Sequence, residues 1–240
     1  MRRETLNHNS KVNLLLLVIV LLSGCMASGP TPTGSNIAEI PMYGGMDRKS
    51  DPRLREADET LIAGVTKEFG SREKASQVFV DQGIRYYQVD NYSMAMKRFN
   101  QAWLIDPSSP GVFWGFAIVY HDEGENCQAR EMLEKAVSLG LSNPISLADA
   151  GRIYTLCAVG GEIVDATTKE RYLQQSEEFY KQAESAAPGN DYIYGLWATA
   201  YYWRGDYVNA WKMVNKQRSL GGTPGGQFIN LLRAKMAEPH

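Results

Sequence analysis

Residues 76–109 read SQVFVDQGIRYYQVDNYSMAMKRFNQAWLIDPSS, and residues 110–143 read PGVFWGFAIVYHDEGENCQAREMLEKAVSLGLSN. Both stretches carry bulky side chains at their fourth, eleventh and twenty-fourth positions, and small side chains at their eighth, twentieth and twenty-seventh. The matched pairs are Phe79 and Phe113, Tyr86 and Tyr120, Phe99 and Leu133, Gly83 and Ala117, Ala95 and Ala129, and Ala102 and Ala136. Small residues suit positions where two helices approach closely, and bulky residues fill the space between them, so this period predicts two helices per unit.

A third unit occupies residues 144–190, which exceeds the period of the first two by about 13 residues. The extra residues fall between its two expected helices. Thr167 and Glu170 form a capping-box pattern that predicts the start of the second helix near Thr168. We therefore expect the loop Ala158–Ala166 to project from the edge of the array.

A fourth unit, residues 191–223, has Gln217 at a usually small position and Gly222 where the first unit has proline. The pattern from Ser76 to Thr223 resembles the tetratricopeptide repeat (TPR). The alternative is an unrelated helical bundle.

The resemblance implies an all-α fold, a TPR superhelical solenoid of about four helix-turn-helix repeats. Apolar residues at helical spacing predict one additional helix within residues 51–70, before the array. Another apolar stretch follows a Pro-Gly-Gly break, and we expect a capping helix within residues 224–237 that covers the last repeat.

The beginning of the chain has the pattern of a signal peptide, residues 1–24. Basic residues precede Val12–Leu22, which is apolar except for Asn13 and is short for a membrane span. The run ends in Leu22-Ser23-Gly24-Cys25, which resembles the bacterial lipobox. The resemblance implies a lipid on Cys25 and a membrane-anchored protein, the alternative being a single-pass anchor with an incidental cysteine.

Met26 follows the expected lipidation site. The resemblance to lipoproteins then points to the outer membrane and its periplasmic face, for a Gram-negative source. Residues 25–50 are rich in Ser, Thr, Gly and Pro, which predicts a flexible tether. Within it, Tyr43-Gly44-Gly45 is an alternative docking segment.

Composition argues against several classes of function. The net charge is −2, and the three His and three Cys are not spaced as a metal site or a redox pair, so we expect no nucleic acid partner, no metal and no cofactor. The polar cluster His121-Asp122-Glu123 lies where a helix is expected to end, and neighbouring residues on a helix do not face one another. We therefore expect no catalytic residues.

A TPR array implies a concave groove lined by the first helix of each repeat. The groove positions are mainly aromatic and aliphatic, which suits an extended or helical peptide anchored by apolar side chains. The alternative is that the superhelix, or residues 51–70 folding across the groove, buries some of them. The predicted partner-binding residues are Val80, Ile84, Tyr87, Trp114, Ile118, His121, Arg152 and Tyr202.

The repeat resemblance also places Cys127 near the start of one helix and Cys157 near the end of its antiparallel neighbour. In an oxidising periplasm these two thiols are expected to form a disulfide. Two separate buried thiols are the alternative, because α-carbons more than about 7 Å apart cannot be bridged without backbone movement.

Together these features predict an outer-membrane lipoprotein that is a non-enzymatic scaffold for a periplasmic protein or peptide. Its plan resembles pilotins, tight-adherence pilus-assembly lipoproteins and the adaptor lipoproteins of murein hydrolases. The alternative is an envelope enzyme or a carbohydrate-binding protein that uses the aromatic groove.

Overall fold

The computed structural model describes residues 36–161 and 165–239. This part of the chain is helical and contains no strand. It begins with two short 3-10 helices, η1 Ile37–Glu39 and η2 Pro41–Gly45. The α-helices are α1 Pro52–Phe69, α2 Arg72–Tyr87, α3 Tyr92–Ile105, α4 Pro110–Asp122, α5 Asn126–Ser138, α6 Pro144–Val159, α7 Ala166–Ala186, α8 Asp191–Trp203, α9 Tyr207–Ser219 and α10 Gly226–Lys235.

None of the described helices combines the length and the apolar character that crossing a bilayer requires. The expected signal peptide, residues 1–24, lies outside the described residues. So do Cys25 and the tether as far as residue 35.

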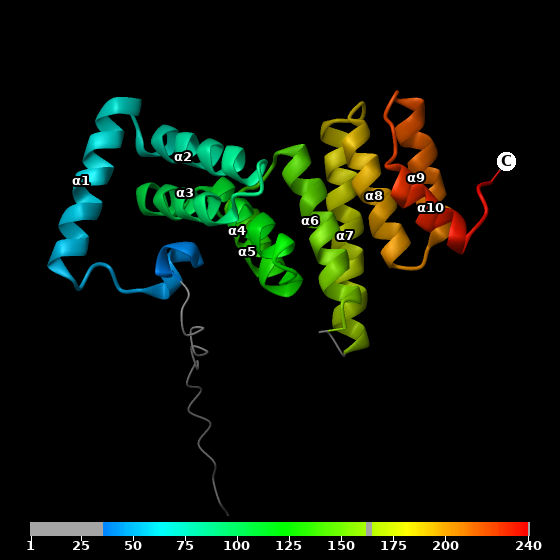
Figure 1. Ribbon diagram of the computed structural model, residues 1–240, viewed down its shortest axis with the longest axis horizontal. Coiled ribbons are helices and arrows are strands. Elements are labelled where there is room, and N and C mark those ends of the chain that lie inside the picture. The colour runs from blue at the N-terminus through cyan, green and yellow to red at the C-terminus, as the bar shows by residue number, and fades with distance from the viewer. Residues whose placement is uncertain (1–35, 162–164, 240) are drawn as a thin grey trace, which may run out of the picture. The chain divides into compact units, whose positions relative to one another are not determined.

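Four helix pairs follow one another along the array: α2 with α3, α4 with α5, α6 with α7, and α8 with α9 (Figure 1). Polar caps and prolines set where these helices begin. Ser71, Asn91 and Asn143 each accept a backbone N–H of the first turn, and Pro110 opens α4. The predicted repeat units are therefore the observed helix pairs.

Close helix approach explains the small residues of the period. The ring of Phe99, fully buried on α3, lies against Gly83 of α2 and Gly115 of α4, and a Cβ on either glycine would overlap that ring. Gly151 of α6 is equivalent to Gly83, and a Cβ there would lie 2.7 Å from the buried ring of Tyr180. One aromatic side chain thus fills the space that a missing side chain leaves on the adjacent helix.

The flexible tether predicted for residues 25–50 is wrong from residue 36 onward. Asn100, buried on α3, donates from Nδ2 to the carbonyls of Ala38 and Ile40 at 3.0 and 2.8 Å, and its Oδ1 accepts the N–H of Tyr43 at 3.1 Å. The composition of residues 25–50 suggested a solvated segment because a local composition carries no information about Asn100, its distant partner on α3. The buried amide satisfies three backbone groups and holds the segment on α3.

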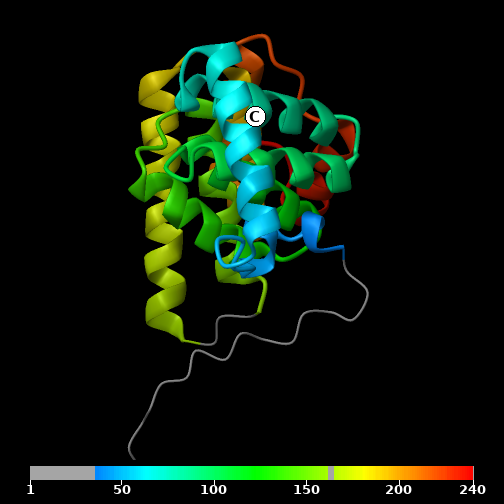
Figure 2. The same cartoon turned by 90° about the vertical axis from the view of Figure 1, so that its left-hand side faces the viewer.

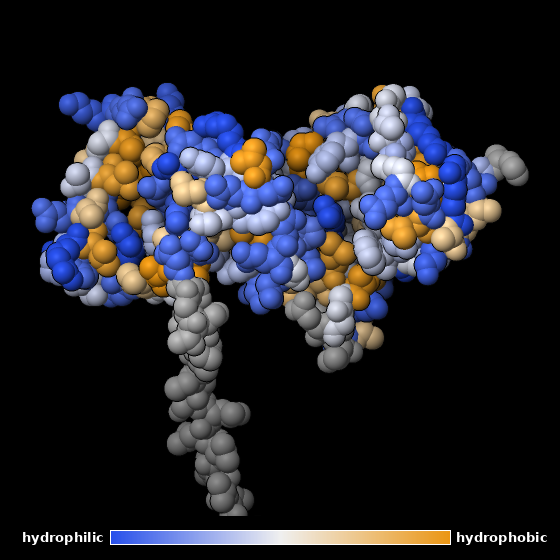
Figure 3. Space-filling model, in the orientation of Figure 1, coloured by the Kyte–Doolittle hydropathy of each residue, from blue (hydrophilic) through white to orange (hydrophobic). Residues whose placement is uncertain are grey.

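The helix expected within residues 51–70 is α1, which crosses the ends of α2 and α3 (Figure 2). The guanidinium of Arg48 donates twice to the carboxylate of Asp58, at 2.8 and 2.6 Å, and links α1 to the preceding segment. A hollow of about 710 Å³ remains between α1 and α3, and apolar side chains including Ile62 and Trp103 line it (Figure 3).

The loop expected at Ala158–Ala166 is shorter in the structure, because helices occupy both of its ends. α6 continues to Val159 and α7 begins at Ala166, so most of the insertion lengthens the two helices. Asp165 caps α7 by accepting the N–H groups of Thr167 and Thr168, at 3.1 and 2.9 Å. Asp165, and not the predicted capping box, therefore sets the start of α7. Residues 162–164 lie outside the described part of the chain.

α10 is the helix expected within residues 224–237. It buries Ile229 and Leu232, and the indole N–H of the buried Trp211 donates to the carbonyl of Met236 at 3.2 Å. The C-terminal segment therefore covers part of the last repeat.

Candidate functional site

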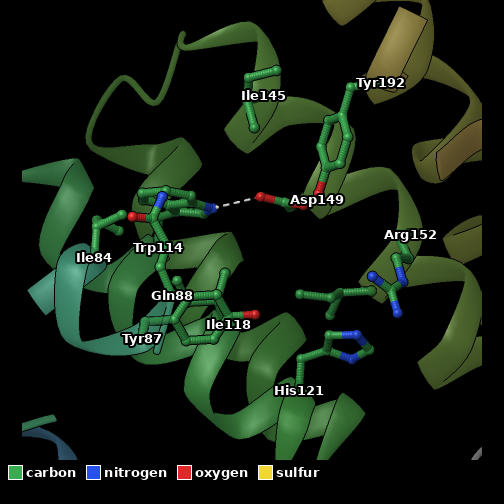
Figure 4. Close-up of a pocket in the computed structure, with 11 residues that line it drawn as sticks. Ile84, Tyr87, Gln88, Trp114, Ile118, His121, Ile145, Asp149, Arg152 and Tyr192 are labelled. Atoms are coloured by element: carbon green, nitrogen blue, oxygen red, sulfur yellow. Dashed lines mark hydrogen bonds between the residues drawn. The ribbon is translucent and has the colours of Figure 1, made fainter. Parts of the chain in front are cut away.

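A pocket of about 370 Å³ opens on the side of the array formed by the first helices of the repeats (Figure 4). Helices α2, α4, α6 and α8 all contribute to it because they occupy equivalent places in successive repeats. Its lining consists of Ile84, Tyr87, Gln88, Trp114, Ile118, His121, Ile145, Asp149, Arg152, Ile153 and Tyr192.

Asp149 is the one acid among the residues that line this pocket. Its Oδ2 accepts the indole N–H of Trp114 at 3.1 Å. Burial raises the pKa of Asp149 from 3.8 to about 6, and the nearby Asp122 adds to the rise, while the Trp114 hydrogen bond and the charge of Arg152 oppose it. The pocket therefore contains a carboxyl group that ionises near neutral pH.

Tyr87 and Tyr192 both lie near the carboxylates of Asp122 and Asp149. Burial, followed by the nearby Asp122, raises the pKa of Tyr87. Burial, followed by the charge of Asp149, raises the pKa of Tyr192. Both phenols stay protonated at physiological pH and remain available to donate hydrogen bonds.

His121 lies at the opposite end of the pocket. Its Nδ1 is 2.7 Å from Oδ1 of Asn126, so this ring nitrogen carries the proton and donates. Burial lowers the pKa of His121, and the charge of Arg152 lowers it further. The imidazole is therefore neutral near pH 7, and its hydrogen-bond partner is an amide, not a carboxylate.

The structure brings together most of the predicted groove residues. Ile84, Tyr87, Trp114, Ile118, His121 and Arg152 line this pocket. Val80 lines an adjoining hollow of about 520 Å³, which shares Ile84 and Trp114 with the pocket. Val80 and Ile118 are only 2% and 5% exposed, so they form the floor of the groove and offer little surface to a partner.

Tyr202 does not line this pocket. Its ring packs against Tyr207 and Phe228, with centroids 5.8 Å away in each case. Phe228 belongs to α10, so the C-terminal helix covers the position that the repeat pattern assigned to the groove.

Asp149 was missed by sequence reasoning. The sequence feature that could have identified Asp149 is a single acid between two alanines, Ala148 and Ala150, which are both buried in the structure. The first repeat also has an acid, Asp81, at the equivalent position, and Asp81 lines the adjoining hollow. A charge in an apolar helical stretch indicates a specific environment, since burial of an unpaired charge is costly.

Cys127 and Cys157 are joined in the structure, with their α-carbons 4.8 Å apart. Cys127 lies in the first turn of α5 and Cys157 in the last turn of α6. The bond links the second repeat to the third just beyond the His121 end of the pocket.

No protein-family model and no curated protein matches this sequence. Among solved structures, the chain is similar to TTC0263, a thermophilic TPR protein of Thermus thermophilus, with 19% identity and a TM-score of 0.55 over 67% of this chain and 80% of that chain. A weaker similarity, to pilF of Pseudomonas aeruginosa, has 20% identity and a TM-score of 0.37 over 68% of this chain and 85% of that one, too low to indicate a common fold. Together with the stacked helix pairs, the similarity to TTC0263 shows that the chain folds as an all-α TPR solenoid.

Proposed function

We propose that this chain is a scaffold whose groove binds a segment of a protein partner. The observation that supports this most is that first helices from all four repeats contribute side chains to one pocket. The pocket continues past Ile84 and Trp114 into the hollow beside it. A groove of that extent suits several consecutive residues of a peptide, with rings as anchors and polar groups to set orientation.

The cellular location is part of the proposal. The lipobox at Cys25 supports a lipid anchor, and a bond between Cys127 and Cys157 suits an oxidising compartment. We therefore place the protein on the periplasmic face of the outer membrane, where it assists assembly of a pilus, secretion or cell-wall complex.

Site-specific photocrosslinking tests the groove assignment. A photoreactive phenylalanine analogue replaces the exposed Gln88 in the groove, and the matched control replaces Lys135, an exposed residue on the second helix of repeat two. We expect Gln88 to crosslink, in cells, to a protein that mass spectrometry identifies and that Lys135 does not capture. Equal products from both positions would contradict the proposal.

A pair of tryptophan variants then measures what the groove contributes. Trp114→Ala removes the central ring, and Trp203→Ala removes a ring that is 56% exposed and lies outside the pocket. We expect the first to weaken capture of the identified partner by about 1 to 3 kcal/mol and the second to leave it unchanged. Unfolding curves of both variants separate lost binding from lost stability.

A carbohydrate ligand is the second candidate. Sugar-binding sites combine aromatic rings with polar groups, and the pocket has Gln88, His121, Asp149 and Arg152 beside its rings. Titration with soluble cell-wall oligosaccharides tests this alternative. Saturable binding that Trp114→Phe weakens would favour it.

A further inference from the structure

The carboxylate of Asp149 has an unused bonding site that faces the pocket. Trp114 donates to Oδ2 at 3.1 Å, and within the described residues no other hydrogen bond or ion pair reaches this carboxylate. A largely desolvated charge is costly unless a donor or an opposite charge compensates it. Because the pocket is open, a ligand can supply that compensation.

Aromatic rings surround this end of the pocket. Trp114 from α4 and Tyr192 from α8 both point toward Asp149, and Tyr87 lines the same cavity from α2 (Figure 4). Trp114 turns its N–H edge to the carboxylate, so the negative charge of Asp149 is what attracts a cation here. The rings offer apolar contact to the stem of a long charged side chain.

Arg152, one turn further along α6, offsets part of the charge of Asp149 but does not pair with it. It forms no ion pair with Asp149 within 4.0 Å in the described residues, and its guanidinium points toward His121 (Figure 4). Asp122 adds negative charge near Tyr87 and Tyr192. The groove thus has a negative end at Trp114 and Asp149 and a positive end at Arg152.

We infer that the negative end binds a lysine side chain of the partner, with apolar residues on either side of that lysine. This inference rests on the partner-binding function proposed above. A lysine fits better than an arginine, because Oδ2 is already bonded to Trp114 whereas a guanidinium pairs best with both oxygens of a carboxylate. The apolar residues on either side of the lysine would pack against Ile84 and Ile145, which line the pocket.

Peptide probes of defined sequence test the inference on the full-length chain in detergent. The probes are acetyl-Gly-Leu-X-Leu-Gly amides in which X is lysine, arginine, glutamate or norleucine. The chain has five Trp, so labelling with 15N-tryptophan gives five indole signals, and Trp114→Phe assigns the one in the pocket. We expect the lysine peptide to shift the Trp114 signal and to bind at least tenfold more tightly than the norleucine or glutamate peptide.

Asp149 and an acid outside the groove provide matched variants. Asp149→Asn keeps an oxygen for the Trp114 hydrogen bond but removes the charge, and we expect it to reduce the preference for lysine over norleucine to less than twofold. Glu178→Gln removes a charge from the exposed side of α7, where Glu178 pairs with Lys181 at 3.1 Å, and should keep the tenfold preference. The other four indole signals report whether each variant is folded.

Arg152→Gln provides an independent test that does not depend on the stability of the Asp149 variant. Removal of this competing cation should tighten binding of the lysine peptide by at least threefold. A preference for glutamate, tighter binding of arginine than of lysine, equal binding of lysine and norleucine, or an unchanged preference in Asp149→Asn would each overturn the inference.

The two proposals fail in different ways. If no charged peptide is preferred but Gln88 still crosslinks to a partner, the groove binds a protein by apolar contacts and only the lysine assignment is wrong. If the lysine peptide binds but no partner is captured, the cation site stands and the scaffold function is wrong.

Discussion

Among single residues, Asp149 couples folding to pH. Its pKa of about 6 in the folded chain exceeds its ordinary value of 3.8, so protonation favours the folded state. The contribution of Asp149 to stability is therefore greatest below pH 4 and is lost as the pH rises through 6. We expect Asp149→Asn to gain about 1 to 3 kcal/mol relative to the wild type between pH 4 and pH 7. Urea unfolding at both pH values measures this gain, and a difference that stays constant with pH would contradict it.

The bond between Cys127 and Cys157 gives a second prediction at the residue scale. It closes a separation of 30 residues, so Cys127→Ser with Cys157→Ser should lower the free energy of unfolding by about 3 to 4 kcal/mol in the chain-entropy model. Alkylation of the wild-type chain purified from the envelope should label neither cysteine until a reductant is added. Two thiols labelled in denatured, unreduced protein would show that the bond does not form in the cell.

Asn100 gives a third prediction, because its side chain makes three hydrogen bonds to the backbone of segment 36–43, whereas Ser93 and Lys97 of α3 reach only the Glu39 side chain. Asn100→Ala leaves its backbone partners without their hydrogen bonds and should cost about 1 to 3 kcal/mol. We expect limited trypsin digestion to cut at Arg48 and Lys49 faster than in the wild type. The control is Gln101→Ala, whose side chain accepts a hydrogen bond from Arg98 on its own helix and bonds to no other described residue, and its cleavage rate should not change.

At the scale of helices, the start of α7 depends on Asp165. This side chain accepts two backbone N–H groups of the first turn, whereas the side chain of Thr167 makes no cap bond to any described residue. Asp165→Ala should therefore lower the melting temperature by a few degrees, and Thr167→Ala should leave it nearly unchanged. Thermal unfolding followed by circular dichroism measures both. A larger effect from Thr167 would restore the capping box predicted from sequence.

At the scale of the whole molecule, the length of the tether limits where the array can lie. Because residues 36–43 bond to α3 and Arg48 bonds to α1, only residues 25–35 remain between the expected lipid and the described fold. A stretch of that length spans at most about 40 Å when fully extended. The array should therefore stay close to the membrane that carries the lipid.

Cys25 provides the test of that anchor. Cys25→Ser should abolish incorporation of a labelled fatty acid and leave an unprocessed precursor, because the thiol is the group that accepts the lipid. Labelling in cells followed by gel analysis measures both effects. The double serine variant of Cys127 and Cys157 is the control and should incorporate label normally, whereas equal labelling of wild type and Cys25→Ser would exclude lipidation at this cysteine.

The sequence by itself determined the helical repeat and its period. Phe99 and Gly83, or Tyr180 and Gly151, carry that information because close approach of adjacent helices excludes side chains at fixed spacings. Most of the groove residues followed from the same period, since equivalent positions of successive first helices line one side of the array. These features depend on contacts between neighbouring repeats. Such contacts recur in each repeat and therefore leave a periodic pattern in the sequence.

The tertiary structure decided which of those residues meet and which polar groups they surround. Trp114 and Asp149 lie 35 residues apart, and Asn100 bonds to backbone groups 57 to 62 residues away, so no local spacing predicts either contact. α10 removes Tyr202 from the groove by placing Phe228 against it. Such contacts depend on how separate helices pack, and the period of the repeat contains no information about them because each of these contacts occurs only once in the chain.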